Sequence, residues 1–192
     1  MRELKDRIVK EGKVLPGNII KVDGFLNHRV DTELLEHIAD EFGRRFDMSK
    51  VTVILTAEAS GIALATVVAH RFGKPMIFAK KAKSDNIEGG LYQSDIFSYT
   101  YKKKVTLLVS KEWLHESDRV LIIDDFMANG EAMRGLCDIV TAAGATLVGI
   151  GCAVEKGFQG GGDRLRAAGV NLKSLAIIES AEPGNIVFRD EE

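Results

Sequence analysis

The chain has 192 residues, of which 45% are hydrophobic and 28% charged, and its formal net charge is −2. This length suits one domain with a sizeable core. So small a charge offers no basic excess to neutralise a nucleic-acid backbone, which argues against a general nucleic-acid-binding protein. Residues 1–11 have the spacing of an amphipathic helix and lack the apolar run of a signal peptide or membrane span. Cys137 and Cys152 lie among apolar residues in the sequence, so we expect both to pack in the core. Such cysteines fit a reducing compartment, and we therefore expect a cytoplasmic protein that does not contact a membrane.

Two segments near the N-terminus differ in regularity. Residues 14–30 hold several apolar side chains but show neither a long helical period nor a clean strand. They are interpreted either as a linker folded over the core or as a lid over a flat apolar ligand. Residues 32–46 have the apolar spacing of an amphipathic helix, with Asp31 or Thr32 at its start.

A strand, a turn of small residues and a helix follow in order. Residues 51–56 predict a buried strand, and residues 62–71 predict a helix. The turn between them, residues 57–61, leaves backbone N–H groups free beside the positive end of a helix dipole, which suits a phosphate. A plain strand-to-helix connection remains the alternative.

The next segment contains a predicted strand and a predicted lid. Residues 76–79 predict the strand, and Lys80, Lys81 and Lys83 follow it. These lysines form a solvated sheet edge or supply positive charge opposite a phosphate. Residues 84–104 are polar and too long for a passive connection, so we expect a flexible loop over about 82–104. A returning strand over 105–110 completes this part of the chain.

A second strand-to-helix junction lies near the middle of the chain. Residues 120–123 are four branched aliphatics, typical of a strand buried on both faces. The strand is expected to stop there, leaving Asp124 and Asp125 exposed, and small residues lead into a helix over 131–143. Two carboxylates suit hydroxyl groups or a divalent cation beside a phosphate. The junction therefore predicts a phosphorylated sugar ligand, although an Asp pair that only caps the helix is the simpler alternative.

The C-terminal part completes the predicted sheet. Residues 146–154 predict a strand, with Lys156 and Phe158 just beyond its carboxyl end, at the sheet edge where ligands of open α/β folds gather. Residues 163–168 predict a short helix, and 172–178 with 186–188 predict a closing pair of strands. Strands that alternate with helices indicate an α/β fold with a mostly parallel central sheet flanked by helices.

Residues 120–132 resemble the phosphoribosyl-diphosphate binding motif of the type I phosphoribosyltransferases, and residues 21–28 and 154–159 support this resemblance along the chain. The resemblance implies the type I fold as a single domain over 1–192, with a small hood from about 1–30 and 155–192. It also implies a homodimer. The sequence supports this assembly, because the first helices and the lysine-rich strand end carry more apolar residues than a small hood can cover, namely Ile62, Leu64, Val67, Val68, Met76 and Phe78. The implied activity is purine salvage: transfer of ribose 5-phosphate from phosphoribosyl diphosphate (PRPP) to xanthine, with Mg²⁺ as cofactor. Another base (guanine, hypoxanthine or adenine) or a non-catalytic PRPP sensor on the same fold remains the alternative.

The resemblance also implies roles for individual residues. Asp124 and Asp125 are the expected catalytic pair, holding the ribose hydroxyls and contacting Mg²⁺ indirectly, since PRPP itself holds the ion. Lys81 is expected to face the diphosphate leaving group. The residues expected to bind PRPP are Ala59, Ser60 and Gly61 in the first turn and Ala128, Asn129, Gly130, Glu131 and Ala132 in the second.

The base is expected between apolar side chains and in-plane donors. Ile20 and Phe158 are the predicted clamp, Phe25 closes it, and Lys156 and Asn27 donate hydrogen bonds. In several purine transferases an aspartate near the imidazole nitrogen of the base occupies the position of Ala128, so no general base is expected from this loop. Xanthine is more acidic than adenine and tolerates that loss.

Overall fold

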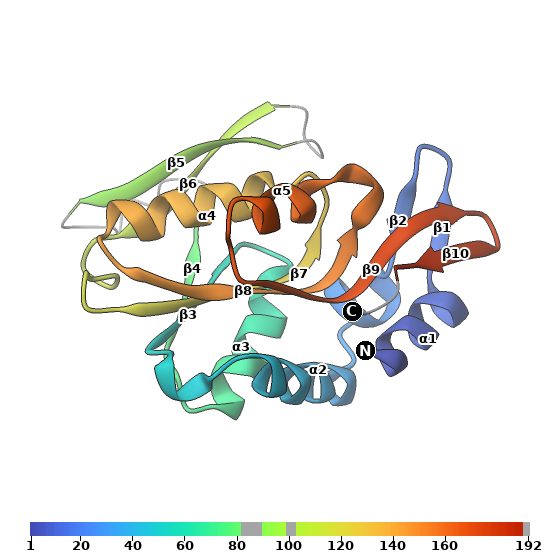
Figure 1. The fold of residues 1–192 in the computed structure, drawn as a ribbon, viewed down its shortest axis with the longest axis horizontal. Coiled ribbons are helices and arrows are strands. Elements are labelled where there is room, and N and C mark those ends of the chain that lie inside the picture. The colour runs from blue at the N-terminus through green and yellow to red at the C-terminus, as the bar shows by residue number, and fades with distance from the viewer. Residues whose placement is uncertain (82–89, 99–102, 190–192) are drawn as a thin grey trace.

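A six-stranded sheet in the order β10-β9-β8-β7-β3-β4 forms the centre of the computed structural model, which describes residues 1–81, 90–98 and 103–189 (Figure 1). The strands are β3 (Val53–Ala57), β4 (Met76–Ala79), β7 (Arg119–Met127), β8 (Thr146–Lys156), β9 (Leu172–Glu182) and β10 (Asn185–Phe188). Neighbouring strands pair in parallel except β9 and β10, which are antiparallel. The predicted α/β class with a mostly parallel sheet is confirmed.

Helices cover both faces of this sheet. Figure 1 shows α2 (Thr32–Arg45) and α3 (Gly61–Arg71) on one face and α4 (Glu131–Ala142) and α5 (Gly161–Ala167) on the other. The start of α2 is set by Asp31, whose side chain accepts a hydrogen bond from Leu34 N at 3.2 Å. Within the described residues, no helix has the length and apolar character needed to cross a membrane.

The hydrophobic core lies on both faces of the sheet, because successive side chains of the central strand β7 point to opposite faces. Val120 and Ile122 of β7 belong to the hydrophobic cluster under α4. Leu121 and Ile123 belong to the cluster that includes α2 and α3. The four branched aliphatic side chains therefore pack into the cores on both faces of the sheet, as the sequence predicted.

The two cysteines pack in the core and are free thiols. Cys152 of β8 is fully buried, and Cys137 of α4 packs against the same cluster. Burial raises the pKa of the Cys137 thiol to about 11, so little reactive thiolate forms at neutral pH. The predicted packing role fits both positions.

An antiparallel hairpin of β5 (Leu91–Ser98) and β6 (Lys103–Ser110) lies over α4 (Figure 1). Arg134 of α4 donates to the carbonyl oxygen of Asp95 at 2.8 Å, and Ser94 Oγ donates to Asp138 at 2.8 Å. Residues 91–98 of the predicted flexible loop thus form a strand anchored on α4. Residues 82–89 and 99–102 of that loop lie outside the described residues.

The N-terminal segment contains short regular elements that the sequence did not reveal. After α1 (Arg2–Glu11) come β1 (Lys13–Leu15), β2 (Ile19–Lys21) and a π-type helical turn, η1 (Asp23–Asn27). Phe25 and Leu26 of this turn are fully buried in the core. This packing agrees with the linker interpretation for residues 25 and 26, and the lid over a flat ligand stays a prediction. The Phe25 ring has no exposed surface, which argues against its predicted role in closing the base pocket.

The C-terminal strands extend the central sheet. The first part of β9 pairs with β8 from Leu172 to Ile178. Its remaining part pairs with β10 and lies beside α1 and the β1–β2 hairpin (Figure 1). The residues predicted to form a hood therefore include a strand that belongs to the main sheet.

Candidate active site

An open cavity of about 210 Å³ lies at the carboxyl ends of β3 and β7, where these strands lead into α3 and α4. Its wall contains many of the predicted residues, namely Ser60, Lys81, Asp124, Ala128, Asn129, Gly130, Glu131 and Ala132. Ala59 and Gly61 adjoin Ser60 in the chain. The structure therefore brings together the two predicted phosphate turns, the first carboxylate and the lysine.

The acidic pair lies inside a strand rather than beyond its end. β7 continues to Met127, with Asp124 opposite Cys152 and Phe126 opposite Val154 on β8. Asp124 is 6% exposed and Asp125 1% exposed. The predicted strand end after Ile123 and the predicted exposure of both carboxylates are wrong, because pairing with β8 keeps the backbone extended and turns both side chains into the protein.

Asp124 points toward the turn between β3 and α3. A Cβ atom at Gly61 would overlap with Asp124 Oδ1 and Thr56 Oγ1, so only glycine leaves room for this carboxyl group. Burial, followed by the negative charge of Asp125, raises the pKa of Asp124, while Lys81 acts in the opposite direction. Burying an ionisable carboxyl group beside a second carboxylate costs free energy, and such groups are found mainly at functional sites.

Asp125 points toward the N-terminal segment, as expected for the neighbour of Asp124 along a strand. Its Oδ2 accepts a hydrogen bond from Asn27 Nδ2 at 2.7 Å. The amide of Asn27 carries two N–H donors. One of them holds Asp125, so the structure adds a partner to Asn27, and the second N–H keeps the predicted contact with the base as a prediction.

The turn after β7 has the features of an anion site. Gly130 directly precedes α4 as its N-cap and has a φ of +79°, a conformation that glycine adopts without steric cost. The carboxylate of Glu131 accepts a hydrogen bond from Arg134 at 3.2 Å and lies 3.5 Å from Phe97 N. Arg134 therefore offsets the one negative side chain of this turn, and the helix dipole favours an anion there.

The turn after β3 faces this site across the cavity. Glu58 Oε1 accepts a hydrogen bond from the backbone N–H of Lys81 at 2.6 Å, and the Glu58–Ala59 peptide bond is cis. Both Glu58 and Lys81 line the cavity. Sequence reasoning missed Glu58, although it is the one charged residue of the predicted turn at residues 57–61.

Among the predicted base-binding residues, Lys156 lies beside Phe126, and Ile20 and Phe158 belong with Phe126 to the same hydrophobic cluster. Lys156 Nζ donates to the carbonyl oxygen of Asn18 at 3.0 Å and lies 5.5 Å from the centroid of the Phe126 ring. Burial lowers the pKa of Lys156. Ile20, in the same β1–β2 hairpin as Asn18, is 7% exposed, and Phe158 packs half-buried against the same core cluster.

Phe126 itself lines the cavity and was missed by sequence reasoning. The sequence could have identified Phe126, which directly follows the acidic pair. If the predicted strand had ended at residue 126 instead of 123, the alternation of side chains would have placed Phe126 on the same face as Asp124. Ile96, Phe97 and Met127 also line the cavity and were not predicted.

The chain belongs to the phosphoribosyltransferase family, since the family model of the phosphoribosyl transferase domain matches residues 29–168. The xanthine phosphoribosyltransferase of Lachnoclostridium phytofermentans is 54% identical over 194 residues, covering 100% of both chains. That of Bifidobacterium adolescentis is 52% identical over 98% of this chain and 100% of its own.

Solved structures resemble the fold at lower identity. The adenine phosphoribosyltransferase of Saccharomyces cerevisiae superposes with a TM-score of 0.74 at 17% identity, covering 91% of this chain and 99% of that chain. The enzyme of the same name from Rhodothermus marinus has a TM-score of 0.73 at 20% identity, covering 91% and 98%. At such identities the likeness concerns the fold alone.

Proposed function

We propose that the protein transfers the 5-phosphoribosyl group of PRPP to xanthine, giving xanthosine 5′-monophosphate and diphosphate in purine salvage. The observation that carries this proposal is the 54% identity, over the full length of both chains, to a xanthine phosphoribosyltransferase. The reaction class also suits a cavity in which two strand-to-helix turns flank the buried Asp124.

The 5-phosphate is assigned to the turn after β7. Backbone N–H groups of residues 128–132 and the N-terminal end of α4 bind it, as helix N-termini bind anions generally. The diphosphate is assigned to Ala59, Ser60 and Gly61 with Lys81. The ribose lies between these two turns, with its hydroxyl groups toward Asp124 and Asp125.

The chemistry follows from this placement. Xanthine first loses its imidazole N–H proton to solvent. A lone pair of the resulting ring-nitrogen anion then forms the new bond to the anomeric carbon, the bond from that carbon to diphosphate oxygen breaks, and diphosphate leaves with the electron pair. Bond breaking ahead of bond making develops positive charge on the ribose. Asp124 and Asp125 stabilise that charge, and Lys81 stabilises the negative charge on the leaving group.

Mg²⁺ is proposed as a cofactor that enters with PRPP. In residues 1–81, 90–98 and 103–189, no three His, Cys, Asp or Glu side chains are placed to hold a metal ion. Asp124, which lines the cavity, and its neighbour Asp125 would contact the ion indirectly, while PRPP oxygens would hold it. Bound Mg²⁺ neutralises charge on the leaving diphosphate.

The base is assigned to the space beside Phe126. Phe126, Ile20 and Phe158 contact its flat faces, and Lys156 and the second N–H of Asn27 donate to its ring plane. A charged donor near the ring carbonyls favours the anionic form of an acidic base. This preference suits xanthine and agrees with a site that has Ala128 in place of a carboxylate.

A panel of free bases tests the proposal. Xanthine, guanine, hypoxanthine and adenine are each incubated with PRPP and Mg²⁺, and diphosphate release is measured. We expect the highest kcat/KM for xanthine. A higher value for another base would assign the site to that base, and no release with any of the four would favour a non-catalytic sensor of PRPP.

A further inference from the structure

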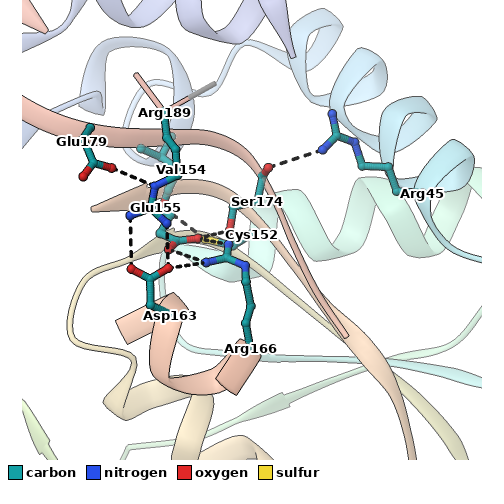
Figure 2. Close-up of polar contacts among 9 residues, drawn as sticks. All are labelled: Arg45, Cys152, Val154, Glu155, Asp163, Arg166, Ser174, Glu179 and Arg189. Carbon is teal, nitrogen blue, oxygen red and sulfur yellow. Dashed lines mark hydrogen bonds and ion pairs between the residues drawn. The ribbon is translucent and has the colours of Figure 1, made fainter. Parts of the chain in front are cut away.

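A buried carboxylate outside the proposed chemistry holds α5 on the sheet. Glu155, at the end of β8, has no exposed surface. Its oxygens accept hydrogen bonds from Arg166 Nη1 at 3.0 Å, from Arg166 Nη2 at 2.5 Å and from the hydroxyl of Ser174 (Figure 2). A buried carboxylate needs such partners, because it has lost its hydration.

The first turn of α5 rests directly on this carboxylate. A Cβ atom at Gly162 would overlap with both carboxylate oxygens of Glu155. Asp163 of the same helix pairs with Arg189 at 2.7 Å, and Arg189 pairs with Glu179 of β9 at 2.8 Å (Figure 2). Ion pairs between side chains this exposed add little stability, so the buried contacts at Glu155 and Gly162 are what hold α5 on β8.

α5 also touches the turn assigned to the 5-phosphate. A Cβ atom at Gly161 would lie 2.5 Å from the carbonyl oxygen of Ala128 and 2.6 Å from the carbonyl carbon of Asn129. Arg164 Nη2 donates to the carbonyl oxygen of Asn129 at 3.0 Å. These contacts join backbone segments that are more than 30 positions apart in the sequence.

The contact of Arg164 fixes the direction of a peptide group. The C=O and the following N–H of a trans peptide point in opposite directions. Because the Asn129 carbonyl is held toward Arg164, the N–H of Gly130 faces away from Arg164. An anion site needs this arrangement, with N–H groups toward the ligand and carbonyl oxygens turned away from it.

We propose that Arg164 is a positioning residue for phosphate binding. It holds the Asn129 carbonyl away from the 5-phosphate, and the Glu155–Arg166 pair keeps α5 in place for this contact. The inference rests on the proposed function, which assigns the 5-phosphate to residues 128–132. Arg164 acts through the backbone of Asn129 and needs no contact with the ligand.

The test is the equilibrium binding of ribose 5-phosphate to the full-length protein, measured by calorimetry. Arg164→Met keeps the aliphatic stem and removes the guanidinium. We expect about tenfold weaker binding of ribose 5-phosphate, since one charge-assisted hydrogen bond is lost. The xanthine KM and the kcat at saturating PRPP should stay within about twofold of wild type. Arg164→Lys retains a donor and should restore part of the affinity.

Arg189→Met is the matched control, because it removes a guanidinium that contacts α5 through Asp163 without reaching Asn129. Its affinity for ribose 5-phosphate should equal that of wild type. Unchanged affinity in Arg164→Met, equal losses in both variants, or a wild-type protein that does not bind ribose 5-phosphate would each overturn the inference. A wild-type protein that binds ribose 5-phosphate yet releases no diphosphate with any base would overturn only the proposed function.

Discussion

The side-chain amide of Asn27 donates a 2.7 Å hydrogen bond to Asp125 Oδ2, joining residues 98 positions apart. Asn27 belongs to η1, whose Phe25 and Leu26 are anchored in the core. A fixed helical turn therefore orients the carboxylate that is proposed to hold the ribose. The same amide is proposed to contact the base, so ribose and base positions are coupled through one side chain.

Replacing Asn27 tests this coupling. Asn27→Leu keeps a similar volume but leaves an oxygen of the buried Asp125 without its donor. We expect a loss of about 1–3 kcal/mol in the free energy of unfolding, measured in urea, and a roughly tenfold higher xanthine KM. The control is Asn171→Leu, since Asn171 is exposed and its amide donates to the carbonyl of Val148. This variant should lose less free energy of unfolding. Wild-type stability and KM in Asn27→Leu would contradict the coupling.

The raised pKa of Asp124 predicts a pH dependence of stability. Burial and Asp125 favour the protonated form of Asp124 in the folded protein. Its contribution to stability is therefore complete below the unfolded pKa of about 3.9 and is lost as the pH rises through the folded value. Asp124→Asn is uncharged throughout, so without Mg²⁺ or ligand it should have a higher Tm than wild type at neutral pH. The difference should shrink toward about pH 4.

An activity measurement distinguishes a catalytic acidic pair from a purely structural one. The double variant Asp124→Asn with Asp125→Asn should reduce kcat by at least about a hundredfold. Asp163→Asn is a control whose effect on stability has the opposite pH dependence, because the hydrogen bond from Arg189 lowers the pKa of Asp163. That variant should be less stable than wild type at neutral pH, with the difference fading as pH falls, and should keep its activity. Near-normal turnover in the double variant would refute the catalytic assignment.

The parts of the site that sequence predicted are those with local signals. Four branched aliphatics in a row identify a strand with two buried faces, and Gly130 marks the turn into α4 because its backbone has a positive φ. These signals depend on neighbours in the chain. They placed both predicted phosphate turns and the acidic pair at one edge of the sheet.

The errors concern features that depend on distant parts of the chain. Asp124 and Asp125 are buried because β8 continues to pair beside them, which no local pattern encodes. β1 and β2 have three residues each, too few to show an alternating pattern. The contact of Arg164 with Asn129 spans 35 positions and involves a backbone carbonyl that every sequence contains.

Gly61 is predicted to be irreplaceable because Asp124 occupies the space of its missing side chain. Gly61→Ala would force Cβ against Asp124 Oδ1 and Thr56 Oγ1. We expect a loss of about 1–3 kcal/mol in the free energy of unfolding, as for other overpacked sites, and weaker PRPP binding by calorimetry. Gly24→Ala is the control, since a Cβ there meets no atom within 4 Å. Equal behaviour of the two variants would show that the close approach of Asp124 is unimportant.

The homodimer stays a prediction, and the structure changes its basis. Leu64 and Val68, counted in the sequence as surplus apolar residues, are buried in the protein's own core. Phe78 on the edge strand β4 is 37% exposed and remains a candidate contact. We expect sedimentation at micromolar concentration to show a dimer, and Phe78→Glu to shift it toward the 21.0 kDa monomer. Trp113→Glu, at a more exposed ring, should leave the dimer intact, and a wild-type monomer would contradict the prediction.

Lys156 offers the sharpest test of where the base binds. Its ammonium group contacts the Asn18 carbonyl and lies over Phe126, and its pKa is lowered by burial. A ring carbonyl of xanthine that loses this charged donor should lose about 1.5–3 kcal/mol, a roughly ten- to hundredfold loss in efficiency. Lys156→Ala should therefore raise the xanthine KM strongly, as measured by diphosphate release, and barely change the affinity for PRPP.

Two comparisons decide whether Lys156 contacts the base or only supports the β1–β2 hairpin. Lys173→Ala removes an exposed lysine of β9 and should leave both substrates unaffected. If Lys156 merely held the hairpin through Asn18, the variant would show a lower Tm and similar losses for xanthine, guanine and hypoxanthine. A donor to a xanthine carbonyl affects xanthine most, because that base has two ring carbonyls. Equal losses for xanthine and PRPP would mean that the base lies elsewhere in the cavity.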